Sequence, residues 1–215
     1  MDAPPPRRRT ASDEVERALL DAAAHLLTTE GPGALSVRRV AADAGVSPMG
    51  VYSRFGAKQG LVEALFIDGF ARLEEVLAAV PVTGDPVGDL HEGCRCYRQF
   101  ALDSPAAYAV MFSRAIPEFV PSDHCKMNAA VAFDVLVEGV RRGMAAGALR
   151  PADPVDVAEG VWATIHGLVS LELAGMGFVP DRAAHFEATL GALLRGLSRE
   201  GPPEPGRGRP GPPRP

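Results

Sequence analysis

Residues 36–58 read SVRRVAADAGVSPMGVYSRFGAK, and they predict two short helices joined by a tight turn. Apolar residues recur at helical spacing before Gly45, which supplies the permissive backbone of the turn. Ser47 can cap the second helix, and Pro48 occupies its first position, where the missing N–H costs nothing. The pattern is typical of a helix-turn-helix, whose second helix enters the major groove of DNA.

The second helix has two faces of different character. Val51 and Phe55 lie four residues apart on the face that is expected to pack against the first helix. The opposite face is polar and aromatic, so we expect it to point away from the protein and toward DNA. That face carries Pro48, Met49, Gly50, Tyr52, Ser53 and Arg54.

From Gly45-Val46-Ser47 through Tyr52, Phe55 and Lys58 to Leu61, the chain resembles the DNA-binding signature of the tetracycline-repressor (TetR) family of one-component regulators. The resemblance covers about residues 13–66. Arg54 stands where a histidine is common in this family. Gly60 replaces a better helix former, which predicts a looser first turn in the helix that follows.

The resemblance implies a set of DNA-contacting residues, which begins at Ser36 and ends at Lys58. Their DNA is expected to be a palindromic, double-stranded operator, because a dimer must place two recognition helices about 34 Å apart. Arg38 can form two hydrogen bonds to guanine. Arg38, Met49, Gly50 and Ser53 are expected to reach base edges, and Ser47, Tyr52, Arg54 and Lys58 to hold the phosphate backbone. Ser36 and Pro48 complete the predicted set.

Composition and length indicate a soluble globular protein. The 215 residues, 47% of them hydrophobic, are enough to build a full core. We find no run of about 18 uncharged apolar residues and no apolar leader segment, so we expect a cytoplasmic protein with no membrane span. The cysteines Cys94, Cys96 and Cys125 are odd in number, which favours reduced thiols over a disulfide framework.

The net charge of −5 argues against a nucleic-acid partner only until it is divided along the chain. Residues 1–66 carry eight Lys or Arg and eight Asp or Glu, whereas residues 67–215 carry fourteen and nineteen. A neutral unit can still bind DNA when its basic residues gather on one surface, because local potential attracts phosphate. We therefore expect binding that is moderate and sensitive to salt.

The rest of the chain predicts further helices, and no segment shows the alternation typical of a strand. We expect an all-α fold, with a three-helix DNA-binding domain at residues 12–66 and a helical effector-binding and dimerisation domain at 67–200. Ser12 is expected to cap the first helix, and residues 81–89 to form a loop. Disordered segments are expected at 1–11, where Arg7–Arg9 either contact DNA or are simply solvated, and at 201–215.

The last two helices, expected at about 154–175 and 181–199, are predicted to form the interface of a homodimer. Apolar residues occupy several faces of the first of them and one stripe of the second. Ala184, Ala188 and Ala192, on the other side of the last helix, are small enough for close helix approach. The predicted interface comprises Val161, Ile165, Leu168, Phe186, Leu190, Leu193, Leu194 and Leu197.

Trp162, His166 and Gly167 resemble the Trp-His-Gly motif of one C-terminal domain class in the same family. Members of this architecture are similar in enclosing a ligand cavity, and apolar walls with one or two polar groups suit a small hydrophobic or aromatic effector. His166 is either the polar group of such a cavity or a structural hydrogen-bonding residue. The predicted lining is Phe100, Tyr108, Met111, Phe112, Phe133, Trp162 and His166.

The sequence shows no catalytic constellation, so we expect no enzyme and no cofactor. His91, Cys94 and Cys96 suggest a metal sensor, but residue 96 lies about 160 to 200° around a helix from the other two, so we expect no metal. We interpret the chain as a ligand-responsive transcriptional regulator, most often a repressor in such families. The alternatives are an activator of the same fold, a ligand-binding or scaffold protein that no longer reads DNA, and an all-α enzyme.

Overall fold

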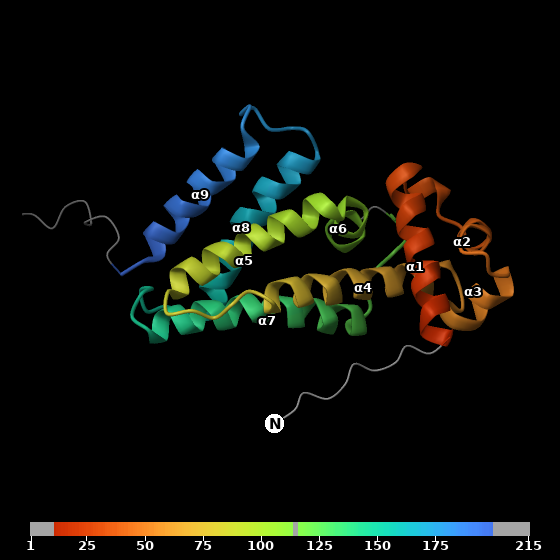
Figure 1. The fold of residues 1–215 in the computed structure, drawn as a ribbon, viewed down its shortest axis with the longest axis horizontal. Coiled ribbons are helices and arrows are strands. Elements are labelled where there is room, and N and C mark those ends of the chain that lie inside the picture. Colours follow the sequence, from red (N-terminus) through yellow and green to blue (C-terminus); the bar gives the residue numbers. More distant parts are fainter. Residues whose placement is uncertain (1–10, 114–115, 200–215) are drawn as a thin grey trace, which may run out of the picture. The chain divides into compact units, whose positions relative to one another are not determined.

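The computed structural model describes residues 11–113 and 116–199 (Figure 1). Two segments were expected to be disordered, 1–11 and 201–215. Residues 1–10 and 201–215 lie outside the described residues, whereas Ala11 is the first residue of a helix. Within them no strand occurs, and a single isolated bridge joins Leu149 to Ser198, so the fold is all-α as predicted. The helices are α1 (Ala11–Thr29), the 3₁₀ turn η1 (Pro32–Ala34), α2 (Val37–Asp43), α3 (Pro48–Phe55), α4 (Lys58–Ala78), α5 (Pro86–Asp103), α6 (Pro105–Phe112), α7 (Asp123–Ala145), α8 (Pro154–Leu173) and α9 (Arg182–Leu197).

The chain divides into two compact units, each of which is described by itself. Unit 1 contains residues up to 80 together with 95–135, and unit 2 contains residues 81–94 together with those from 136 onward. All of α4 therefore belongs to the unit that holds the helix-turn-helix. The functional boundary between residues 66 and 67 stays a prediction, because packing divides the chain at other positions.

The helix-turn-helix forms as its sequence predicts. Gly45 has a φ of 65°, a left-handed conformation that favours glycine. The Ser36 hydroxyl oxygen accepts a hydrogen bond from the Arg39 N–H at 3.4 Å and caps α2. The Ser47 hydroxyl oxygen accepts one from the Gly50 N–H at 3.2 Å and caps α3. Val40 and Val51 are fully buried, which joins the two helices through their apolar faces. The turn, the cap at Ser47 and the position of Pro48 are confirmed, and the cap at Ser36 is an additional finding.

In unit 1, α4 packs closely against the end of α3 and against α6 (Figure 1). A Cβ at Gly60 would lie 2.0 Å from the carbonyl oxygen of Phe55, and one at Gly69 would lie 2.8 Å from the Met111 sulfur. The prediction of a looser first turn considered only the low helix propensity of Gly60 and not this close contact. The missing side chain is what allows α4 to begin directly against the last turn of α3.

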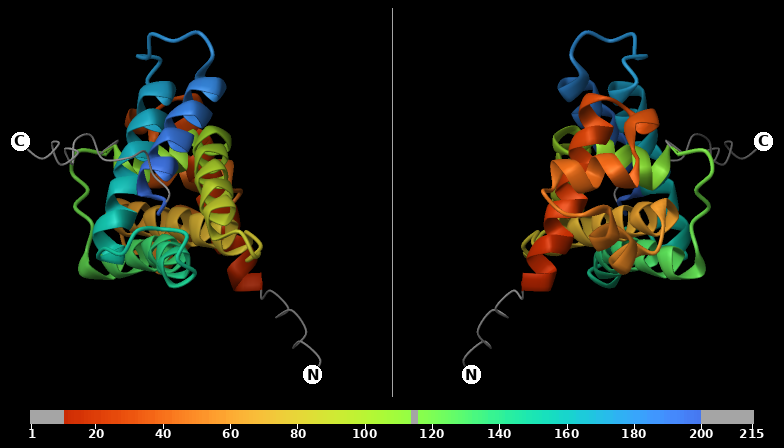
Figure 2. Two further views of the ribbon diagram at one scale, coloured as in Figure 1. Left: turned by 90° about the vertical axis from the view of Figure 1, so that its left-hand side faces the viewer. Right: turned by 90° about the vertical axis from the view of Figure 1, so that its right-hand side faces the viewer.

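Unit 2 is built around α8 and α9, which lie side by side and are joined by a loop at one end (Figure 2). The far end of α9 is fixed by two backbone hydrogen bonds, from Arg150 N–H to Leu197 O at 2.9 Å and from Arg199 N–H to Ala148 O at 3.1 Å. His91 of α5 lies 3.3 Å from a carboxylate oxygen of Glu187 on α9. These contacts join α9 to α5 and to the segment that follows α7.

Two element boundaries differ from those expected. Helix α5 begins at Pro86, inside the predicted loop, because Pro86 stands in the first turn and the Asp85 carboxylate accepts from the Gly88 N–H at 3.0 Å. Composition alone had suggested a loop there. In unit 1, α1 begins at Ala11, so Ser12 lies inside the helix and is not its cap.

The predicted dimer interface stays a prediction, and the structure places most of its residues inside unit 2. Five side chains of that set are 0 to 3% exposed in the single chain, so they fill the interior of unit 2 and offer no surface to a partner. The reason is that an apolar stripe must be covered, but other helices of the same unit cover this one. The buried five are Val161, Ile165, Phe186, Leu190 and Leu194, whereas Leu168, Leu193 and Leu197 are half-buried.

Gly60→Ala should destabilise the protein, although alanine is the better helix former. The new Cβ would overlap the Phe55 carbonyl oxygen, and we expect a loss of about 1–3 kcal/mol in the free energy of unfolding, measured by urea denaturation. Gly93→Ala is the matched control, because nothing lies within 4 Å of its added Cβ, and it should gain about 0.5–1 kcal/mol. A Gly60→Ala variant as stable as the wild type would show that α4 is not tightly held there.

Candidate DNA-binding surface and effector site

Among the described residues, helix α3 keeps one face exposed. Val51 is fully buried, whereas the side chains of Met49 and Tyr52 are 72% and 48% exposed. Pro48 and Ser53 are also exposed, and Gly50 is half-buried where an added Cβ would meet a methyl group of Val46 at 2.6 Å. The face predicted to read DNA is thus the face that the fold leaves open.

Two adjacent arginines of α2 differ in what they contact. Arg39 forms two hydrogen bonds to the carboxylate of Glu30, at 2.6 and 2.5 Å, and this contact lowers the pKa of Glu30. Arg38 is exposed, and within the described residues it has no hydrogen bond or ion pair. Arg38 is therefore the arginine of this pair that is available for a base or a phosphate.

Arg54 is directed at α1. Its Nη2 donates to the Ser12 backbone carbonyl at 3.5 Å and to the Ser12 hydroxyl at 3.4 Å. Its Nε is buried and has no acceptor within the described part of the chain. The side chain links the last turn of α3 to the start of α1, so its role at phosphate stays a prediction. Lys58, at the start of α4, is half-buried.

The aromatic residues predicted to line an effector cavity come together in part, inside unit 1. The rings of Tyr108 and Phe112 lie 4.9 Å apart, and Phe112 lies 5.3 Å from Phe70 of α4. Tyr97 and Tyr108 are both buried, and their hydroxyls are 3.4 Å apart. Arg72 lies over the Phe100 ring at 5.9 Å. Met111 is buried against Gly69, and Phe133 is half-buried on α7.

The sequence analysis missed Phe70 and Tyr97 as members of this cluster. The signal for Phe70 was present, because Phe66 and Phe70 are four residues apart on α4 and their rings lie 4.8 Å from each other. Tyr97 is a buried aromatic residue of α5. What the sequence could not give is that its hydroxyl faces that of Tyr108.

Trp162 and His166 belong to unit 2, so the predicted lining is shared between the two units. Their rings lie 5.6 Å apart on α8, and the His166 Nε2 lies 3.4 Å from the Ser170 hydroxyl oxygen. Burial lowers the pKa of His166, because an apolar environment disfavours the charged imidazolium. The neutral ring is therefore the form that the fold prefers.

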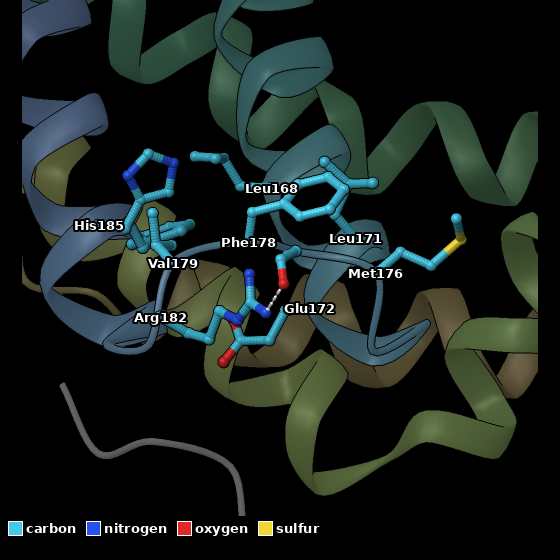
Figure 3. Close-up of a pocket in the computed structure, with 10 residues that line it drawn as sticks. Leu168, Leu171, Glu172, Met176, Phe178, Val179, Arg182 and His185 are labelled. Carbon is cyan, nitrogen blue, oxygen red and sulfur yellow. Dashed lines mark hydrogen bonds between the residues drawn. The ribbon is translucent and has the colours of Figure 1, made fainter.

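A hollow lies between α8, α9 and the loop that joins them (Figure 3). It has a volume of about 250 Å³, and its walls are mainly apolar. Arg182 donates to the Gly177 carbonyl oxygen and ties the loop to the start of α9. Phe178, on the same loop, is fully exposed. The pocket lining is Leu168, Leu171, Glu172, Met176, Gly177, Phe178, Val179, Arg182, His185 and Phe186.

No group of three His, Cys, Asp or Glu side chains in the described residues is arranged to hold a metal ion. His91 pairs with Glu187, and the Cys125 thiol lies 3.6 Å from a carboxylate oxygen of Glu63. Burial raises the pKa of the Cys125 thiol. Of the residues weighed as metal ligands, His91 thus has a structural partner in Glu187. In the same residues, no helix has the length and apolar character needed to cross a bilayer.

These features define an all-α helix-turn-helix protein with a second helical unit. Comparison with known proteins gives the family: residues 19–65 match the bacterial regulatory proteins of the tetR family, and residues 90–193 match the tetracyclin repressor-like C-terminal domain. The chain belongs to the TetR family. The resemblance of Trp162, His166 and Gly167 to the Trp-His-Gly class stays a prediction.

Relatives of this chain are distant in sequence and close in fold. It is 23% identical over 153 residues to the HTH-type transcriptional regulator Rv1816 of Mycobacterium tuberculosis, and the match spans 69% of this chain and 65% of that protein. A solved structure of a protein with unknown function from Rhodococcus sp. RHA1 is 26% identical with a TM-score of 0.77, over 92% of this chain and 100% of that one. The TetR family transcriptional regulator PfmR from Thermus thermophilus is 21% identical with a TM-score of 0.65, over 84% and 99% of the two chains.

His166 should make the protein less stable in acid. Burial lowers its pKa in the folded state below the value near 6.5 of the unfolded chain, so only the unfolded chain gains a proton as the pH first falls through 6.5. This contribution to stability is complete above pH 6.5 and is lost progressively as the pH falls toward the folded-state pKa. The free energies of unfolding of the wild type and of His166→Gln, measured from pH 7.5 to 5, should therefore converge or cross in favour of the variant. A constant difference across that range would contradict the burial of the imidazole.

Proposed function

We propose that this protein is a DNA-binding transcriptional regulator, acting as a repressor that binds a palindromic operator as a homodimer in the cytoplasm. The observation that carries the proposal is the open face of α3, where Met49 and Tyr52 are exposed, together with the exposed Arg38 of α2. Membership of the TetR family supports it. An activator of the same fold would present the same surface, so the sense of regulation depends on where the operator lies.

The proposal is tested by a binding assay on the DNA that flanks the protein's own gene. A duplex from this region should be shifted at protein concentrations that leave an unrelated duplex of equal length unbound. Equal affinity for both duplexes, or no binding to either, would leave only the scaffold and enzyme alternatives.

We place the dimer face on the outer side of α9 and the loop before it. Ala184, Ala188 and Ala192 follow one another on an exposed strip of α9, and small side chains allow a partner helix to approach closely. Phe178 is fully exposed and Met176 is 66% exposed on the adjoining loop. A large exposed apolar surface of this kind is typical of a protein interface.

We propose that the effector acts through α4. Within unit 1, Asp68 of α4 accepts from Arg17 of α1 at 2.9 Å, and Arg72 donates to the Ser104 hydroxyl at 3.0 Å. The Phe70 ring of the same helix packs on Phe112 of the aromatic cluster. A hydrophobic ligand that displaced Phe112 would therefore move a helix that is bonded to α1 and begins against α3.

A coupling of about 1–3 kcal/mol between effector and operator would be enough to release the DNA. Linkage requires that operator lower the affinity for effector by the same factor. Aromatic compounds titrated into the protein–operator complex should therefore displace the DNA. A compound that binds tightly and leaves operator affinity unchanged would show that the cluster is not an effector site.

Arg38→Ala should relax the specificity of binding at one operator position. We expect it to lose about 1–3 kcal/mol on the preferred operator and much less on a duplex already changed at that base pair. Arg39→Ala is the control, since Arg39 is held by Glu30 and should not alter base preference. An equal loss on all duplexes would make Arg38 a phosphate contact.

Lys58→Ala should weaken binding to operator and to unrelated DNA alike. A lysine at phosphate releases counterions on binding, so its loss should reduce the slope of log affinity against log salt concentration by about one unit. Affinities measured at several salt concentrations give this slope directly. An unchanged slope would remove Lys58 from the phosphate contacts.

Ala188→Glu should separate the dimer without unfolding the chain, since residue 188 is exposed. Sedimentation should show a monomer with wild-type helical content, and operator binding should be lost. Ala130→Glu adds the same charge at an exposed position of α7 and should leave the dimer intact. An Ala188→Glu dimer of normal stability would place the interface elsewhere.

A further inference from the structure

Helix α3 has little means of identifying a base by paired hydrogen bonds. Its sequence PMGVYSRF contains no Asn, Gln, Lys, Asp or Glu, which together with Arg are the residues that form specific pairs with base edges. Its one arginine, Arg54, is half-buried and bonded to Ser12 of α1. The Ser53 hydroxyl donates to the Gly50 carbonyl at 3.1 Å, and serine in any case bonds to several bases.

The same helix exposes an apolar side chain where a reading residue is expected. Met49 is 72% exposed at the second position of α3, beside the exposed Pro48. Gly50 follows without a side chain, and Val46 occupies the space below it. The first turn of the helix therefore offers DNA a protruding thioether on a low, apolar surface.

In the major groove, thymine is the base that displays an apolar group, its C5-methyl, while the other base edges there display hydrogen-bonding atoms. We propose that Met49 reads this methyl group, so that each operator half-site has a thymine facing the start of α3. The inference rests on the proposed function, since it requires that α3 enter the groove. Guanine is then recognised from α2 by Arg38, and thymine from α3 by apolar contact.

The choice of Met49 over Tyr52 follows from chemistry. Tyr52 is also exposed, but its side chain ends in a hydroxyl, which suits a phosphate oxygen and carries no preference for one base. Met49 has no polar group to satisfy, so it gains only by leaving water for another apolar surface. A flexible thioether can also adapt its shape to a methyl group.

The test begins with selection of duplexes from a random-sequence library by the full-length protein. The thymines of the selected half-site are then replaced one at a time by deoxyuridine, which lacks only the C5-methyl. One replacement in each half-site should lower affinity about fourfold per methyl, the effect of one lost apolar carbon, while replacements elsewhere should have no effect. A cytosine at that position should bind weakly, and 5-methylcytosine should recover part of the loss.

Met49→Ala links the effect to the side chain. This variant should bind the thymine and deoxyuridine duplexes with equal affinity, because the methyl contact is already absent. Met127→Ala is the matched control, since Met127 is a similarly exposed methionine of unit 1, on α7, and it should keep the wild-type preference.

Two outcomes overturn different claims. The protein could select a sequence and yet bind every deoxyuridine duplex as well as its thymine parent, or Met49→Ala could keep the preference for the methyl group. Either result would show that Met49 does not read thymine, and the proposed function would still stand. If the protein selects no sequence at all, the proposed function fails and the inference falls with it.

Discussion

The contact on which unit 1 depends is the one between the start of α4 and the Phe55 carbonyl at the end of α3. Gly60 leaves no side chain there, and any Cβ would overlap the carbonyl oxygen. This close approach lets Leu61 and Val62, both fully buried, complete the core beneath the helix-turn-helix. Because the recognition helix is only eight residues long, it depends on such contacts for its position.

A second set of contacts makes α4 part of the same packed unit as the aromatic cluster. Gly69 admits Met111 of α6, Phe70 packs on Phe112, and Asp68 is bonded to Arg17 of α1. One helix thus touches the DNA-reading helices at its start and the cluster at its middle. A close-packed interior transmits small shifts, since it has no space to absorb them. This is the physical basis on which we assign coupling to α4.

The helix-turn-helix could be predicted from sequence because its determinants are local. The turn at Gly45, the cap at Ser47 and the proline at position 48 act within a few residues of one another. Contacts between distant residues could not be predicted in this way. The hydrogen bond from Arg54 to Ser12 spans 42 positions, and no local pattern in the sequence indicates it.

The prediction of a dimer face shows the same limit for a different reason. The stripe through Phe186, Leu190 and Leu194 correctly indicated a buried face of α9, but periodicity does not say what covers it. The structure covers it with its own unit and leaves Ala184, Ala188 and Ala192 outside. Likewise, the aromatic residues predicted to line one cavity are divided between two units, which composition cannot reveal.

The central claim is that a dimer of this chain places α3 in the major groove at two sites of one duplex. Dimethyl sulfate footprinting on a selected duplex tests it most directly, because the reagent methylates guanine N7 in the major groove and adenine N3 in the minor groove. The account predicts protection of guanine N7 at two positions about one helical turn apart, with adenine N3 still reactive beside them. Protection confined to adenine N3, or at a single site, would contradict it.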